Sequence, residues 1–250
     1  MAEIKSGCKH NSCENYDVKN CECDNKRLLE NLFMCHQMAN EHEKKQKAQT
    51  SSRQTSVNDS KVPIIWVLGG PGCGKGTQCD KIVAKYHFNH LSTGDLLRAE
   101  VASGSAKGQE LQAVMKAGGL VSNDVVLELL AAAIKKIEKP TGFLIDGYPR
   151  EEAQGRAFEE AISPVDLILY FECTDETLVA RIQARAAAST EVRADDNEET
   201  LKTRIKTFRE NTEKILVQYP AKLKRINAER YIDEIFNDVT AGIDGILASK

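Results

Sequence analysis

The chain has 250 residues, a formal net charge of −3, 41% apolar residues and 28% charged residues. This length suits one large domain with a short additional segment, and the composition is that of a globular protein rather than a disordered one. The charge gives no basic field for nucleic acid, and no apolar run approaches the roughly 20 residues that span a bilayer. We therefore expect neither nucleic-acid nor membrane binding.

Residues 1–60 form a polar segment that holds five of the eight cysteines. The segment lacks the apolar core of a secretory signal and contains several acids, so we expect a cytoplasmic protein with reduced thiols. Its Cys-x-His and Cys-x-Cys spacings differ from the paired Cys-x2-Cys of common zinc modules, which favours free thiols and leaves zinc binding as an alternative. The candidate ligands would be Cys8, His10, Cys13, Cys21, Cys23, Cys35 and His36.

Within this segment, Leu28, Leu32 and Cys35 recur at helical spacing and predict one amphipathic helix over about residues 26–45. Its apolar side packs on the chain's own domain or docks on a protein partner, and the sequence leaves both open. Residues 46–60 are rich in Ser, Thr, Gln and Lys and are typical of a linker. We therefore divide the chain into an extension with linker, 1–60, and a domain, 61–250.

From residue 61 onward, strands and helices are predicted to alternate. Such alternation predicts an α/β fold, a doubly wound parallel sheet of five strands flanked by helices on both faces. Strands are expected at 62–68, 88–91, 143–146, 166–172 and 223–227, and helices at 75–86, 94–103, 107–117, 123–137, 175–188, 197–218 and 232–248.

A glycine-rich segment, Gly69–Thr77, follows the first predicted strand and opens the first helix of this domain. Glycines let several backbone N–H groups face one anion, and the helix N-terminus adds its positive dipole end. The alternative, a plain tight connection, does not explain the Gly-x4-Gly-Lys spacing, so we predict a P-loop that binds a nucleoside triphosphate. Its expected ATP-binding residues are Gly72, Cys73, Gly74, Lys75, Gly76 and Thr77.

Four further segments, taken with this loop, resemble nucleoside monophosphate kinases and in particular adenylate kinases with a short lid. They are residues 91–98 (LSTGDLLR), 142–150 (GFLIDGYPR), the pair Arg181 and Arg185, and 193–204 (RADDNEETLKTR). The resemblance implies reversible transfer of a phosphoryl group, MgATP + AMP = 2 ADP, by a monomer whose ligands are ATP, AMP and ADP. It also implies an AMP-binding flap at about 92–121 and a short lid at about 185–196.

Phosphoryl transfer between two nucleotides requires cations that position and neutralise phosphate charge, and arginine binds phosphate oxygens in bidentate fashion. For each arginine alone, a solvated helix surface is the simpler reading. By resemblance, Arg98 and Arg150 grip the acceptor phosphate, and Arg181 and Arg185 hold the ATP phosphates. Two further arginines clamp the transferring group and the acceptor, so the expected catalytic set is Lys75, Arg98, Arg150, Arg185, Arg193 and Arg204.

Asp146 ends an apolar predicted strand, where a carboxylate is costly without a partner. Magnesium held through water would supply that partner, with the Thr77 hydroxyl as a second oxygen at the ion, and a turn or helix-cap role is the alternative. The expected cofactor is therefore Mg²⁺ bound with ATP.

The identity of the acceptor depends on Thr93 and Gln154. In the family, threonine at the first position and an amide four residues after Arg150 favour AMP, whereas UMP/CMP kinases carry alanine at the first. A kinase for UMP or CMP is therefore the alternative, as is a nucleotide-binding domain that serves its extension. The remaining expected AMP-binding residues are Gly119, Leu120, Val121, Gly147, Tyr148 and Pro149.

Two departures from the family pattern concern the lid and the last strand. Arg193 follows Arg181 at a spacing that makes the lid tip slightly longer than usual, and Arg230 stands where relatives often have a glycine near adenine. Some long members of the family use an N-terminal extension as an address to a cytoskeletal or flagellar structure. The same role is a hypothesis for residues 1–60.

Overall fold

The computed structural model describes residues 62–188 and 198–249, which belong to one compact unit, Thr55–Lys250. The predicted helix at 26–45, the linker at 46–60, the cysteine and histidine candidates of the extension, and Arg193 lie outside these residues.

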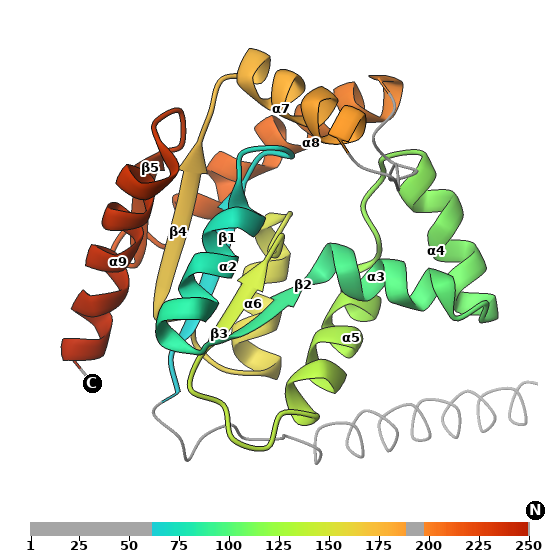
Figure 1. Cartoon of the computed structure of the whole chain (residues 1–250). Coiled ribbons are helices and arrows are strands. Elements are labelled where there is room, and N and C mark those ends of the chain that lie inside the picture. The colour runs from blue at the N-terminus through green and yellow to red at the C-terminus, as the bar shows by residue number, and fades with distance from the viewer. Residues whose placement is uncertain (1–61, 189–197, 250) are drawn as a thin grey trace, which may run out of the picture. The chain divides into compact units, whose positions relative to one another are not determined.

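The unit is built on five parallel strands, as predicted, and the structure places them in the spatial order β2-β3-β1-β4-β5 (Figure 1). Their register places Val67 beside Asp146 and Gly69 beside Phe171. After β1 the chain runs to β2 at one edge of the sheet, and after β3 it crosses β1 to reach β4 and β5 at the other edge. The connections that leave β1 and β3 therefore run in opposite directions, and the carboxyl ends of these two strands form the switch point where ligands bind in such folds. The strands are β1 (Ile64–Gly69), β2 (Asn89–Ser92), β3 (Phe143–Asp146), β4 (Leu167–Glu172) and β5 (Leu223–Asn227).

Eight helices surround the sheet within the described ranges, and Figure 1 shows them on both of its faces. They are α2 (Lys75–Tyr86), α3 (Thr93–Ala102), α4 (Ala106–Lys116), α5 (Asn123–Lys135), α6 (Glu152–Ala161), α7 (Asp175–Ala188), α8 (Glu198–Leu216) and α9 (Ile232–Ala248). In this part of the chain, no helix combines the length and apolar character needed to cross a membrane.

Alternation along β1 assigns its side chains to two separate cores. Ile65 and Val67 are buried in a core with apolar residues of α2, α7 and α9. Ile64 and Trp66 point the other way, into a core with residues of α5, α6 and the end of α8. Because both faces are covered, β1 is apolar throughout, as expected for the centre of a parallel sheet.

Helix α6 was missing from the sequence prediction, which placed no helix between 146 and 166. Its only large apolar residue is Phe158, and Gly155 lies at its centre, so the helical period of apolar residues is weak. Tertiary packing decides the conformation. Phe158 meets Trp66 edge to face with ring centroids 5.5 Å apart, and a Cβ on Gly155 would lie 2.7 Å from the Tyr219 hydroxyl oxygen.

The helices α3 and α4 form an arm beside β2 (Figure 1). Ser92 caps α3 by accepting a hydrogen bond from the Asp95 backbone N–H, and Ser105 caps α4 in the same way from Gly108. Gly108 also allows the two helices to approach closely, since a Cβ there would lie 2.4 Å from the Glu100 carbonyl oxygen. These local features fix the direction of the helix that carries Arg98.

Candidate active site

The predicted phosphate loop connects β1 to α2 at the switch point of the sheet. Gly72 and Gly74 have φ angles of 84° and 93°, a left-handed conformation that other residues rarely adopt. A Cβ on Gly72 would also lie 2.8 Å from the Leu178 carbonyl oxygen. The glycines therefore serve a loop that must curl tightly and pack against α7, with the N-terminus of α2 at its end.

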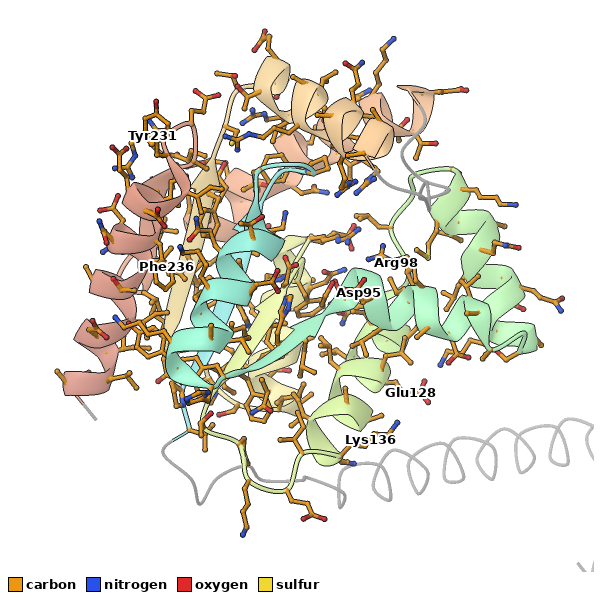
Figure 2. The ribbon with its side chains drawn as sticks, viewed as in Figure 1. Asp95, Arg98, Glu128, Lys136, Tyr231 and Phe236 are labelled. Atoms are coloured by element: carbon orange, nitrogen blue, oxygen red, sulfur yellow. The ribbon has the colours of Figure 1, made fainter. Side chains whose placement is uncertain are left out.

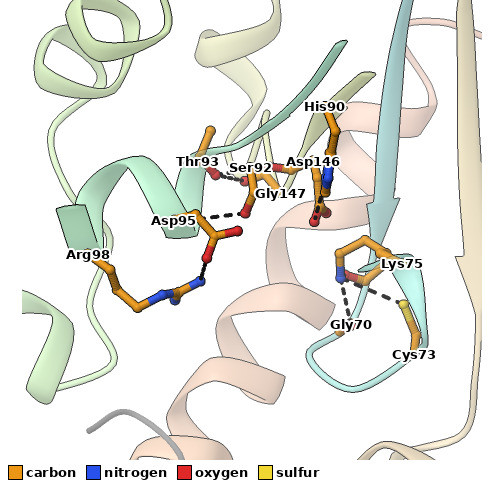
Figure 3. A network of polar contacts seen from close by, with 11 residues as sticks. Gly70, Cys73, Lys75, His90, Ser92, Thr93, Asp95, Arg98, Asp146 and Gly147 are labelled. Carbon is orange, nitrogen blue, oxygen red and sulfur yellow. Dashed lines mark hydrogen bonds and ion pairs between the residues drawn. The ribbon is translucent and has the colours of Figure 1, made fainter. Parts of the chain in front are cut away.

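Lys75 folds its side chain back into this loop. The ammonium group donates to the carbonyl oxygens of Gly69 and Gly70 at 2.8 and 3.0 Å and lies 3.7 Å from the Cys73 sulfur (Figure 3). A point charge is thus fixed beside the backbone N–H groups of the loop. Together they make a site for a polyanion such as a triphosphate.

A cavity of about 690 Å³ opens in front of the loop. Its walls bring together cationic side chains from α3, the segment after β3, α7, α8 and the loop before α9, although these lie far apart in sequence. The arginines that line it are Arg98, Arg150, Arg181, Arg185, Arg204 and Arg230, and the loop contributes Gly72, Cys73, Gly74, Lys75, Gly76 and Thr77.

Several of these guanidinium groups are oriented by main-chain oxygens. Arg181 donates to the carbonyl oxygens of Cys73 and Ala228 at 3.3 and 2.9 Å, and Arg150 Nε donates to that of Gly147 at 2.9 Å. Arg98 pairs with Asp95 on the same helix turn, and Figure 2 shows the two side by side. Carbonyl oxygens orient an arginine without cancelling its charge, so Arg181 remains suited to an anion.

Arg230, like Arg98, pairs with a carboxylate. Its guanidinium pairs with Asp238 of α9, and its Nε donates to the Asn227 carbonyl oxygen at 3.2 Å. The side chain lines the cavity, so the position that departs from the family pattern is part of the cavity wall.

A second, smaller cavity of about 60 Å³ lies against the first. Arg98, Arg150 and Arg204 line both cavities, so a ligand in the small one would share its cations with a ligand in the large one. The small cavity gathers the residues predicted for the acceptor nucleotide, Thr93, Gly119, Leu120, Val121, Gly147, Tyr148 and Gln154, whereas Pro149 lines the large cavity.

Thr93 and Gln154 are buried, with 2% and 3% of their surfaces exposed, and both make structural hydrogen bonds. The Thr93 hydroxyl lies 3.1 and 3.0 Å from the carbonyl oxygens of Asp146 and Gly147. The Gln154 amide oxygen accepts the Arg150 backbone N–H at 2.8 Å. Both side chains therefore hold the wall of the small cavity as well as facing into it.

Asp146 lies at the carboxyl end of β3, with its side chain 13% exposed. Within residues 62–188 and 198–249 its Oδ1 atom is buried and has no hydrogen-bond partner. An unpartnered buried carboxylate oxygen is costly and suits a hard cation. Thr77, an exposed hydroxyl, lines the same cavity, so the oxygen donors present fit magnesium.

Sequence reasoning missed two neighbours of Asp146, namely His90 and Cys79. His90 Nε2 lies 3.7 Å from Asp146 Oδ2, and this interaction raises the pKa of His90. Burial, reinforced by the Asp146 carboxylate, raises the pKa of the Cys79 thiol well above its ordinary value. The contact between His90 and Asp146 depends on the pairing of β2 with β3, and a single sequence does not reveal that pairing.

A phosphate loop that faces converging arginines across two joined cavities defines a class, the P-loop phosphotransferases that act on nucleotides. Comparison with known proteins gives the family. A family model described as adenylate kinase matches residues 67–224. The chain belongs to the adenylate kinase family.

Individual relatives agree with this assignment. The chain is 59% identical over 222 residues to "Adenylate kinase 1" of Drosophila melanogaster, which covers 88% of this chain and 96% of the relative. It is 54% identical over 187 residues to "Adenylate kinase isoenzyme 1" of Caenorhabditis elegans (73% and 88% covered). It is 47% identical over 189 residues to the human protein of that name (74% and 96% covered).

The match to the fruit-fly relative has a consequence for the extension. A match over 88% of this chain is longer than residues 61–250, so it continues into the segment before residue 61. The matches to the worm and human proteins are short enough to fit within residues 61–250. Part of the extension is therefore shared with at least one relative.

Glu229 provides a pH-dependent test of how the loop before α9 is tied to α7, the helix that carries Arg181. Hydrogen bonds from the Thr177 hydroxyl and from the backbone and side chain of Thr174 lower the pKa of Glu229 to about 2. A carboxylate whose pKa is depressed by folding stabilises the protein above its ordinary pKa, near 4.5, and this contribution is lost as the pH falls toward 2. Glu229→Gln should therefore lower the free energy of unfolding at pH 7, and the difference should vanish in acid.

The measurement is guanidinium unfolding of both proteins across this pH range. Glu160→Gln, at an exposed position of α6, controls for the loss of one surface carboxylate. An equal effect of Glu229→Gln at both ends of the range would contradict the prediction.

Proposed function

We propose that this chain transfers the terminal phosphoryl group of ATP directly to AMP, giving two ADP, at the junction of the two cavities. The observation that carries the proposal is that the two cavities share three of the arginines that line them. Arg98, Arg150 and Arg204 border both the large cavity at the phosphate loop and the small cavity beside it. A donor in the first and an acceptor in the second would meet at these three cations.

On the donor side, the loop N–H groups and Lys75 would bind the ATP phosphates, with Arg181 and Arg185 approaching from α7. On the acceptor side, Arg98, Arg150 and Arg204 would grip the AMP phosphate and the group in flight, together with Arg193 of the lid. The acceptor phosphate is already ionised near neutral pH, so no strong general base is required. Catalysis is then positioning and charge neutralisation.

Magnesium bound with ATP would be held through water by Asp146, with the Thr77 hydroxyl nearby, and would neutralise charge on the β- and γ-phosphates. Asp146 suits this role because its buried Oδ1 atom has no partner among the described residues.

Water is the main competing acceptor in such a reaction. We assign its exclusion to closure of the flap, about 92–121, and the lid, about 185–196. The arm formed by α3 and α4 carries Arg98, so its movement would bring a cation toward the donor site as it covers the acceptor.

The clamp is tested by Arg150→Ala. Loss of a group that binds the acceptor phosphate in the transition state should lower kcat by about 10²–10³. Arg156→Ala, which removes a 70% exposed guanidinium on α6, is the matched control and should stay near wild type. Turnover in a coupled ADP assay is the measurement. Near-normal kcat in Arg150→Ala protein would reject the assigned clamp.

Acceptor choice is tested with a panel of AMP, dAMP, CMP, UMP and GMP. We expect the highest kcat/KM for AMP and a shift toward UMP and CMP in Thr93→Ala protein, by about tenfold, because the lost hydroxyl shapes the small cavity. Thr240→Ala removes a similar hydroxyl-to-carbonyl hydrogen bond on α9 and controls for stability. Faster turnover of UMP or CMP than of AMP by the wild type would favour a pyrimidine kinase instead.

We assign the enzyme to the cytoplasm as a monomer, and residues 1–60 to the binding of a protein partner that addresses it to a cytoskeletal or flagellar structure. The support is the predicted amphipathic stripe at Leu28, Leu32 and Cys35 and the reach of the fruit-fly match into this segment. Deleting residues 1–60 should leave turnover intact and alter the distribution of a fluorescent fusion in cells. Identical distributions of the two fusions would dismiss the addressing role.

A further inference from the structure

Three side chains that the proposed reaction does not fully use meet behind the phosphate loop. Cys79 of α2, His90 of β2 and Asp146 of β3 each offer one ligand atom, and these atoms all lie within 4.8 Å of one another. Asp146 is far from the other two residues in sequence, and the three come from three different elements. Figure 3 shows His90 and Asp146 facing each other close to Lys75 and the phosphate loop.

Two of these side chains, His90 and Asp146, are half-buried, and each has one buried atom with unmet hydrogen-bonding capacity. His90 Nε2 and Asp146 Oδ1 have no hydrogen-bond partner in the part of the chain that the structure describes. The 3.7 Å between His90 Nε2 and Asp146 Oδ2 is too long for a direct hydrogen bond. Buried polar atoms in native proteins are normally satisfied, and those that lack a protein partner commonly contact an ion or a water molecule.

The donor set indicates which ion would fit. A thiolate, an imidazole and a carboxylate together favour zinc, whereas magnesium prefers oxygen alone. Ligand atoms around a tetrahedral zinc ion lie about 3.3–3.8 Å apart, so the cluster needs to contract by roughly 1 Å. The thiol would release its proton to solvent on binding, as thiols do when they ligate zinc.

The cluster is also accessible from the cavity. His90 and Asp146 line the cavity of about 690 Å³, and Cys79, which is fully buried, lies behind them. Three protein ligands leave the fourth tetrahedral position for water or a phosphate oxygen on the cavity side.

We propose that Cys79, His90 and Asp146 form an inhibitory site for zinc. A zinc ion at this place takes the Asp146 carboxylate and sets a second divalent charge beside Lys75. The inhibitory consequence rests on the proposed function, in which Asp146 serves the magnesium of ATP. The binding of zinc itself does not depend on that function.

The test compares wild-type full chain with Cys79→Ser and with the control Cys173→Ser, which alters a half-buried thiol outside the cluster. Because the extension contains five further cysteines, the readout is the difference between proteins. Cobalt(II), a spectroscopic substitute for zinc, should give a thiolate charge-transfer absorption that falls in Cys79→Ser and not in Cys173→Ser. Bound zinc should fall by one equivalent in the same variant.

Inhibition is measured with free zinc set by a metal buffer, and each protein is normalised to its own zinc-free rate. The half-inhibitory zinc concentration should rise about tenfold or more in Cys79→Ser and stay unchanged in Cys173→Ser. His90→Asn removes a second proposed zinc ligand. If Cys79→Ser does not fold, the cobalt spectrum and the zinc inhibition of His90→Asn test the site instead. Wild-type cobalt spectra and zinc inhibition in the folded ligand variants would overturn the site.

This outcome is distinct from failure of the proposed kinase activity. The zinc-free rate with AMP reports that activity directly, and the cobalt spectrum is recorded without nucleotide. If the protein turns over AMP but shows no cobalt absorption that depends on Cys79, the zinc site is rejected and the assignment as a kinase stands.

Discussion

The structure depends on one electrostatic constraint, the gathering of cations and N–H dipoles at the carboxyl edge of the sheet. Two nucleotides carry several negative charges to one place, and they approach each other only where those charges are neutralised. The phosphate loop meets one part of this need with the N-terminus of α2 and Lys75. In the proposed function, the arginines of α3, α7, α8 and the segment after β3 that line the cavity meet the rest.

The same constraint explains why Arg181 is held by carbonyl oxygens. Arg181 reaches the Cys73 and Ala228 carbonyls, so it ties the phosphate loop to the end of β5 while it keeps its charge. A carboxylate partner would orient the guanidinium equally well but would compete with phosphate. Arg98 and Arg230 each have such a partner, in Asp95 and Asp238 respectively.

Asp146 lines this cationic cavity together with two other acidic residues, Asp80 and Asp95, and its surroundings relate the magnesium and zinc proposals. Its Oδ1 atom, which has no partner within the described ranges, suits a hard cation in the cavity, while His90 and Cys79 behind it would suit a softer one. One carboxylate cannot serve both ions fully. Competition between metals is therefore a property of the way β2, β3 and α2 pack together.

The sequence by itself determined the strand and helix alternation, the phosphate loop and the family, because these are local patterns of apolar spacing, glycine and charge. The sequence did not predict α6, because Gly155 and a single large apolar residue, Phe158, give this helix only a weak apolar period. The packing of Phe158 on Trp66 stabilises the helix instead. Only the tertiary structure placed His90 and Cys79 beside Asp146 and gave Thr93 and Gln154 their carbonyl and N–H partners. Such contacts depend on strand order and register, which are set by burial of both sheet faces rather than by any local stretch of chain.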